Sequence, residues 1–119
     1  MSQKHYPKPH AIVVALIGEL GAGKTTFVQK FAKALGITEP VLSPTFVILK
    51  KYGNLVHIDA YRLESAKELE ALEIYDLIAD PNNVIFIEWA DRVKEILPDN
   101  SITIHFDHVN ETTRKISID

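Results

Sequence analysis

The spacing of hydrophobic positions predicts a strand followed by a helix in the first third of the chain. Residues 11–17 (AIVVALI) form a continuous apolar run rich in β-branched side chains, typical of a strand covered on both faces. Glycines interrupt the pattern in residues 18–23, and residues 24–35 then place apolar side chains at helical spacing before Gly36, a typical helix stop. A strand, a glycine-rich loop and a helix in this order predict an α/β domain.

The rest of the pattern predicts antiparallel additions to this unit. Residues 45–51 and 55–59 flank the turn-rich Tyr52-Gly53-Asn54 and indicate a β-hairpin. Further along, we expect a surface helix over residues 64–78 that bends near Glu73, and then a buried strand over residues 84–87. A short helix over residues 90–97 should end at Pro98, and residues 102–106 and 115–118 should form a closing hairpin. The prediction is one domain, residues 1–119, with residues 1–10 as an extended lead-in. Its mixed sheet has a parallel centre and antiparallel hairpins.

Composition narrows the class of protein. The chain has 119 residues, of which 46% are hydrophobic and 24% charged, as in ordinary globular proteins. A net charge of −3 argues against a free-standing nucleic-acid binder, which requires a basic face. The absence of cysteine excludes disulfides, thiolate metal sites and a cysteine nucleophile. No apolar run is long enough to span a bilayer, and the polar opening differs from a secretory signal, so we expect a cytoplasmic protein that binds neither membrane nor DNA.

The glycine-rich segment matches a phosphate-binding loop. Residues 18–25 (GELGAGKT) fit the pattern G-x-x-x-x-G-K-[ST] at every fixed position. Glycines let successive backbone N–H groups point at phosphate oxygens, and the following helix directs its positive dipole end at the same place. In such loops the lysine reaches the β- and γ-phosphates and the hydroxyl binds Mg²⁺, which here indicates Lys24 and Thr25. The sequence therefore predicts a P-loop nucleotide-binding protein with a three-layer fold.

Two acids at strand ends are candidates to organise the metal ion and the reaction. Glu88 follows four consecutive apolar residues, which is the usual setting of the second acid of P-loop proteins, and Asp59 ends the other apolar segment, residues 55–58. We assign Glu88, with Thr25, to the metal ion and Asp59 to the reaction. The pattern leaves open which of the two acids is the direct metal ligand.

Four motifs together resemble those of the TsaE (YjeE) family, small bacterial P-loop ATPases required for the threonylcarbamoyl modification of adenosine beside the tRNA anticodon. They occur in the order GELGAGKTT, SPTF, HIDAYRL and EWADR, at residues 18–26, 43–46, 57–63 and 88–92. The resemblance implies ATP and Mg²⁺ as cofactors. It implies Asp59, Thr45 and Lys24 as catalytic residues, with Thr45 as a switch residue near the γ-phosphate. Thr25 and Glu88 would bind the metal ion, and the nucleotide would contact Glu19, Leu20, Gly21, Ala22, Gly23, Lys24, Thr25, Thr26, Trp89 and Arg114. Glu73 stands where many members of the family have glycine.

The resemblance also implies partners and leaves two alternative functions open. Proteins of this family act beside the transferase TsaD and its companion TsaB, so tRNA would be reached only through that complex. A small-molecule kinase also uses a P-loop, but it needs a second substrate pocket and usually an arginine-bearing lid. A non-catalytic module that regulates a partner by its nucleotide state is the other alternative.

The remaining features favour structural roles. His57 and Asp59 point to one face of the predicted strand, but no cysteine or regular histidine spacing supports a zinc site. No nucleophile elbow supports a Ser–His–Asp triad. Residues 64–73 are most simply a solvated helix face, and Lys50-Lys51 is too short for a nucleic-acid patch.

Overall fold

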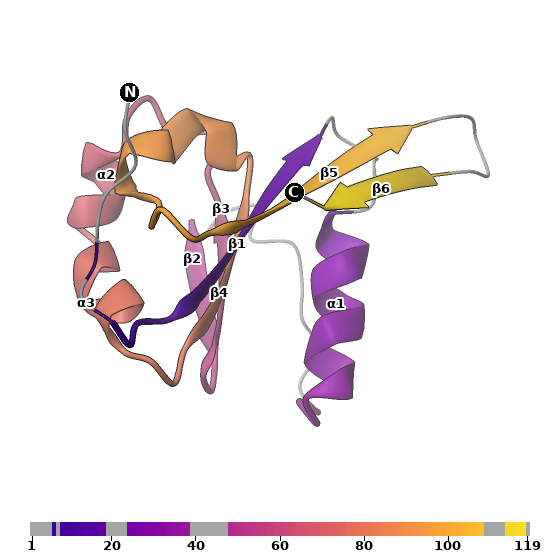
Figure 1. Ribbon diagram of the computed structural model, residues 1–119, viewed down its shortest axis with the longest axis horizontal. Helices are drawn as coiled ribbons and strands as arrows, with labels where there is room; N and C mark the ends of the chain where they lie inside the picture. The colour runs from indigo at the N-terminus through magenta and orange to yellow at the C-terminus, as the bar shows by residue number, and fades with distance from the viewer. Residues whose placement is uncertain (1–5, 7, 19–23, 39–47, 109–113, 119) are drawn as a thin grey trace.

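Among the residues that the structure describes, six strands form a mixed sheet at the centre, in the order β2-β3-β4-β1-β5-β6 (Figure 1). The computed structural model describes residues 6, 8–18, 24–38, 48–108 and 114–118, and only the backbone of Thr25 and of residues 107, 108 and 114–118. The strands are β1 (Ile12–Gly18), β2 (Leu49–Tyr52), β3 (Leu55–Asp59), β4 (Val84–Glu88), β5 (Ile102–His108) and β6 (Arg114–Ile118). Strands β3, β4, β1 and β5 run parallel, and β2 and β6 pair antiparallel at the two edges. The expected mixed sheet with a parallel centre is confirmed.

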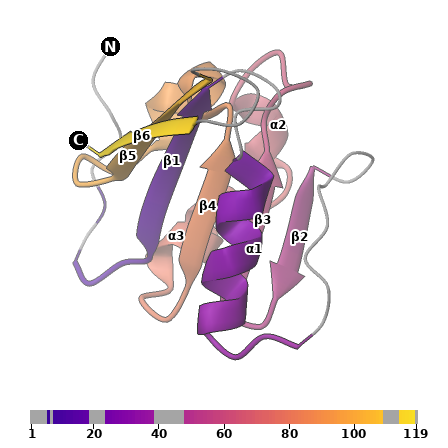
Figure 2. The same cartoon turned by 90° about the vertical axis from the view of Figure 1, so that its right-hand side faces the viewer.

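Helices cover both faces of the sheet and make a three-layer domain (Figure 2). Helix α1 (Lys24–Ala34) lies on one face, whereas α2 (Lys67–Glu70), α3 (Ile74–Ala79) and the 3₁₀ helix η1 (Ala90–Ile96) lie on the other. Because side chains alternate along a strand, β1 contributes Val14 and Leu16 to the core beneath α1 and Val13 and Ala15 to the opposite core. The continuous apolar run that predicted β1 is therefore the signature of burial on both faces.

Helix α1 matches its prediction and ends through a glycine cap. Gly36 has φ of +84°, and its N–H donates to the carbonyl of Lys33 while the Ile37 N–H donates to the carbonyl of Ala32. This is the Schellman arrangement, which satisfies the last carbonyls of a helix when the residue after it adopts the left-handed conformation.

The single helix predicted over residues 64–78 is wrong. The segment forms two short helices, α2 and α3, separated at Glu73, whose φ of +61° is left-handed. A left-handed residue cannot continue a right-handed helix, so the change of direction at the predicted bend is a complete break. Helix η1 lies where a short helix was expected, but it is 3₁₀ and carries a non-helical residue at Val93.

The first predicted hairpin forms with a corrected boundary. Strand β2 begins at Leu49 and includes Tyr52, so that only Gly53 and Asn54 remain in the turn, and residues 45–47 lie outside the described part of the chain. Exposed Lys50 and Lys51 lie on this edge strand, where charged side chains discourage pairing with another sheet. The closing hairpin is also present, as the antiparallel pair β5 and β6.

Within the described ranges, no helix combines the length and apolar character that crossing a membrane requires.

Candidate functional site

The carboxyl ends of three neighbouring strands bring the candidate residues to one edge of the sheet. In the parallel register Asp59 lies opposite Glu88, and Glu88 lies opposite Leu16 of β1, two residues before Gly18. Backbone hydrogen bonds continue beyond the strands, since Ala60 N–H donates to the Glu88 carbonyl at 2.9 Å and Trp89 N–H to the Leu16 carbonyl at 3.0 Å. Ligands of open α/β sheets bind at this edge.

Lys24, the first residue of α1, is fixed in this region. It is 4% exposed, and its Nζ donates a hydrogen bond to the Gly18 carbonyl. Its ammonium also lies 4.3 Å from the centre of the Trp89 ring, a cation–π distance. The lysine predicted to reach the phosphates is thus held between the end of β1 and the residue that follows β4.

Glu88 is a buried carboxylate with a buried partner. It is 5% exposed, and its Oε2 accepts a hydrogen bond from the Nε2–H of His57 at 2.5 Å. His57 is fully buried on β3, two residues before Asp59 and on the same face of the strand. The predicted metal-binding acid therefore has a fixed orientation.

Asp59 is half-buried and held by the backbone that follows it. Its Oδ1 accepts a hydrogen bond from the Tyr61 N–H at 2.9 Å. Burial raises the pKa of the Asp59 carboxyl; the Tyr61 N–H opposes this rise, the charge of Glu88 adds to it, and His57 and Lys24 oppose it. A carboxylate whose charged form is partly desolvated next to a second acid is a common feature of functional sites.

Trp89 forms an aromatic platform beside Lys24. It adopts a left-handed conformation with φ of +59°, which costs a non-glycine residue free energy and often occurs at functional sites. Its ring lies 5.0 Å from that of Tyr61, and the Arg92 guanidinium lies 5.6 Å and 5.9 Å from the Tyr61 and Trp89 ring centres. The predicted nucleotide contact Trp89 thus lies beside the predicted phosphate-binding lysine.

The other predicted site residues are only partly described. Thr26 lies in the first turn of α1 with an exposed side chain, and Thr25 in the same turn and Arg114 on β6 are described by their backbone alone. Six predicted residues lie outside the described part of the chain: Glu19, Leu20, Gly21, Ala22, Gly23 and Thr45.

The described side chains fit Mg²⁺ bound together with a nucleotide. Among them, no group of three or more His, Asp or Glu residues could hold a metal ion without other ligands. Mg²⁺ commonly takes one or two carboxylates together with phosphate oxygens and waters, and Glu88 supplies a carboxylate at the same sheet edge as Lys24. This donor set suits a nucleotide-bound magnesium ion better than a metal site built by protein ligands alone.

Sequence reasoning gave His57 only a structural role and did not consider Tyr61 or Arg92 as part of the site. The spacing of His57 and Asp59 was one available signal, because it places both on one face of β3. The motifs HIDAYRL and EWADR, at residues 57–63 and 88–92, were another, because they contain His57, Tyr61 and Arg92. The tilted contact between the Tyr61 and Trp89 rings depends on the path of the chain after two different strands, which local spacing does not reveal. Arg92 lies three residues after Trp89 on the same segment, and its contact with Trp89 is therefore local.

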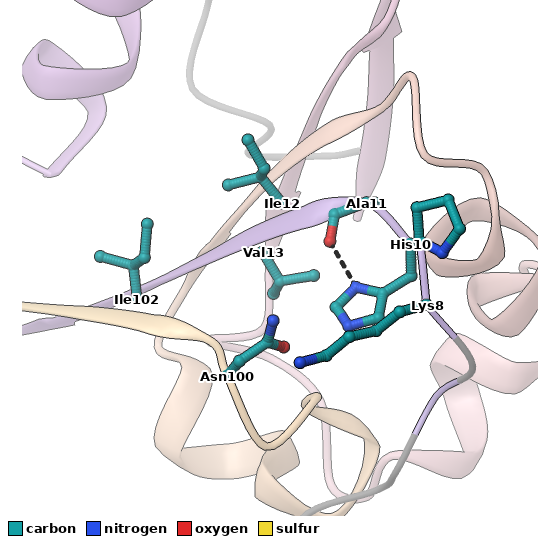
Figure 3. A pocket seen from close by; sticks show the side chains of 8 residues that line it. Lys8, His10, Ala11, Ile12, Val13, Asn100 and Ile102 are labelled. Atoms are coloured by element: carbon teal, nitrogen blue, oxygen red, sulfur yellow. Dashed lines mark hydrogen bonds between the residues drawn. The ribbon is translucent and has the colours of Figure 1, made fainter.

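A cavity of about 580 Å³ lies at the opposite end of β1, away from Gly18 (Figure 3). Lys8, His10 and Asn100 gather on one side of it, and Ile12 and Ile102, which are 53% and 40% exposed, lie on the other. The Nδ1–H of His10 donates to the Ala11 carbonyl at 2.7 Å. This cavity contains none of the predicted site residues.

Comparison with known proteins supports the resemblance of the motifs. Residues 2–116 match the family model described as threonylcarbamoyl adenosine biosynthesis protein TsaE. The chain is 40% identical over 109 residues to the tRNA threonylcarbamoyladenosine biosynthesis protein TsaE of Bacillus subtilis, covering 88% of this chain and 67% of that protein. The equivalent protein of a Nostoc species is 40% identical over 112 residues, covering 89% and 68%.

Comparison of the fold with solved structures agrees with the sequence comparison. The crystal structure of Bacillus subtilis YdiB superposes with a TM-score of 0.70 and 34% sequence identity, covering 92% of this chain and 68% of that one. The chain therefore spans about two thirds of the length of these relatives.

Proposed function

Because this chain belongs to the TsaE family of threonylcarbamoyl adenosine biosynthesis proteins, we propose that it is a magnesium-dependent ATPase acting in that pathway. Its turnover would be low alone and would depend on TsaD- and TsaB-like proteins, whose transferase complex it would act on. That complex, and not this chain, would bind the tRNA and modify the adenosine next to the anticodon.

The observation that carries the proposal is the meeting of one cation and two acids at the end of the parallel strands. Lys24, Asp59 and Glu88 lie beside one another around the end of β1, where the chain enters the segment with the P-loop sequence. A lysine at the first residue of the following helix is the arrangement that P-loop proteins use for phosphates. This arrangement supports a nucleoside triphosphate as the ligand.

The roles of the residues follow from their charge and setting. Lys24 would neutralise the β- and γ-phosphates, and residues 19–26 would donate backbone N–H groups to them. Thr25 and Glu88 would hold Mg²⁺, which when bound neutralises the charge that develops on the phosphate oxygens. Asp59 would orient the attacking water, and Thr45 would respond to the γ-phosphate.

Partner binding is consistent with the surface beside this site. Tyr61 and Arg92 are exposed next to the half-buried Trp89, and tyrosine, tryptophan and arginine are the residues enriched in the energetic centres of protein interfaces. The net charge of −3 also favours a protein partner over direct contact with tRNA.

ATP turnover by the purified chain tests the proposal, with and without the two partner proteins. We expect slow phosphate release by the chain alone and faster release when TsaD- and TsaB-like proteins are added. Lys24→Ala is the control, because it removes the phosphate-binding cation and should abolish ATP binding while the domain stays folded.

Three outcomes would change the assignment. Unchanged ATP affinity of Lys24→Ala would remove the phosphate-loop interpretation. Phosphate transferred to an added metabolite would indicate a kinase, and tight ATP binding with no turnover under any condition would indicate a non-catalytic regulatory module.

A further inference from the structure

The buried contact between His57 and Glu88 has no role in the function described above. The two side chains come from neighbouring strands, 31 positions apart in sequence, and their polar atoms approach to 2.5 Å. His57 is 0% exposed and Glu88 is 5% exposed. Since water has little access to the contact, it cannot readily take over the hydrogen bond to the Glu88 carboxylate.

The hydrogen bond fixes the orientation of both groups. The Nε2–H of His57 donates to Oε2 of Glu88, and its Nδ1 has no hydrogen-bond partner among the described residues. With the proton on Nε2, the unpaired Nδ1 is a lone-pair acceptor, and burying an unpaired acceptor costs less than burying an unpaired N–H. The hydrogen bond to Glu88 and the unpaired Nδ1 therefore assign the proton of the ring to Nε2, so that the ring donates one hydrogen bond, to Glu88.

Its surroundings hold the imidazole ring in place. His57 lies on the α1 face of β3, where Leu55, Phe86 and Tyr52 pack in the core beneath that helix. Phe86 lies opposite His57 on β4 and Lys50 lies opposite it on β2. Because the ring is fully buried, it has few alternative rotamers and can hold the carboxylate on the next strand at one angle.

We propose that His57 is a positioning residue that orients the Glu88 carboxylate to bind a divalent cation. The inference rests on the proposed function, because it requires Glu88 to bind Mg²⁺ together with a nucleotide. Groups that donate a hydrogen bond to a metal-binding carboxylate set its orientation, and losing one typically costs about 10- to 100-fold in metal affinity.

Two substitutions of similar size separate this role from a purely structural one. In His57→Gln the side-chain amide can place an N–H near the position of the histidine Nε2, so it can still donate to Glu88. In His57→Asn the shorter side chain places its N–H near the position of Nδ1 and cannot reach. Both variants replace a buried ring with a smaller polar amide, and His57→Asn, which loses one methylene more than His57→Gln, is expected to be the less stable of the two.

The experiment measures binding of a non-hydrolysable ATP analogue by calorimetry, in EDTA and in saturating Mg²⁺, for the wild type and both variants. The ratio of the two affinities reports the coupling between metal and nucleotide. We expect His57→Asn to lower this ratio about ten-fold and to leave the metal-free affinity unchanged, and we expect His57→Gln to keep a ratio close to that of the wild type. A ¹H–¹⁵N correlation spectrum of the wild type should show the ring proton on Nε2.

The outcomes are distinct. If the wild type binds more tightly with Mg²⁺ and His57→Asn keeps the same ratio, the positioning role is refuted and the proposed function stands. Equal losses in both variants, or a ring proton on Nδ1, also refute the role. If the wild type binds no nucleotide in either condition, the proposed function fails and this inference with it.

Discussion

Replacing Gly18 by alanine tests how closely the strands pack where the phosphate loop begins. A Cβ on Gly18 would lie 2.5 Å from the Phe106 carbonyl oxygen and 3.1 Å from the Phe106 Cβ, whereas ordinary contacts begin at 3.4 Å. The first atom belongs to the backbone of β5, which pairs with β1 on one side and β6 on the other. To bring this contact to 3.4 Å, β1 and β5 would have to separate by about 0.9 Å at this point.

The cost follows from the packing that such a movement disturbs. Phe106 is 3% exposed, and its ring packs edge-on against Phe27 of α1 at 5.7 Å. Overpacking of this kind costs about 1–3 kcal/mol, and a clash with backbone belongs near the upper end. For a domain of this size about 1 kcal/mol corresponds to about 4 °C, so we expect Gly18→Ala to unfold about 8–12 °C below the wild type. Since Lys24 donates to the Gly18 carbonyl, we also expect weaker ATP binding.

Gly36→Ala is the matched control, measured in the same thermal and urea unfolding experiments. Both glycines have a positive φ, +155° at Gly18 and +84° at Gly36, but a Cβ on Gly36 would meet nothing within 4 Å. Only the left-handed conformation is then penalised, by about 1–2 kcal/mol. If Gly18→Ala proves no less stable than Gly36→Ala, the close approach of β1 and β5 does not limit this position and the reasoning is wrong.

Three further predictions concern other parts of the molecule. Tyr6→Phe removes the buried hydrogen bond from the Tyr6 hydroxyl to the Ile96 carbonyl at 2.7 Å, and urea unfolding should show a loss of about 1–2 kcal/mol. Burial raises the pKa of Tyr6 above its ordinary value of 10.0, so the unfolded chain loses this proton first; wild-type stability should fall above about pH 10 more steeply than that of Tyr6→Phe. Glu73→Gly removes the steric strain of a left-handed glutamate with φ of +61° and should raise the unfolding free energy by about 0.5–1 kcal/mol. Equal or lower stability of this variant would show that Glu73 is not strained. Asp59→Ala should bind Mg²⁺ and ATP but release phosphate at least about ten-fold more slowly, and Glu88→Gln should lose the Mg²⁺ dependence of binding; the reverse pattern would exchange the roles of the two acids.

The structure gives a physical meaning to Glu73, which stands where many members of the resembled family have glycine. Glycine adopts a left-handed conformation without steric cost, and Glu73 adopts that conformation between α2 and α3. Helical periodicity runs through this point without a break, which is why the sequence predicted one bent helix. The conformation of a single residue decided between one helix and two.

Local patterns in the sequence determined most of the elements of the chain and its candidate chemistry. The run of residues 11–17 predicted β1, the spacing of residues 24–35 predicted α1, and Gly36 predicted where the helix ends, because each depends on neighbours a few positions away. The P-loop motif and the two acids after apolar runs are local in the same sense. They identified Lys24, Asp59 and Glu88 without any knowledge of the fold.

Only the tertiary structure decided how these parts meet. The strand order places β4 between β3 and β1, so that Asp59 and Glu88 become neighbours although a connection with two helices separates them in sequence. The hydrogen bond from His57 to Glu88 and the position of Trp89 beside Lys24 have the same origin. Periodicity reports which face of an element is buried, but sheet order depends on the packing of the whole chain, and it is sheet order that brings these separate residues together as one candidate site.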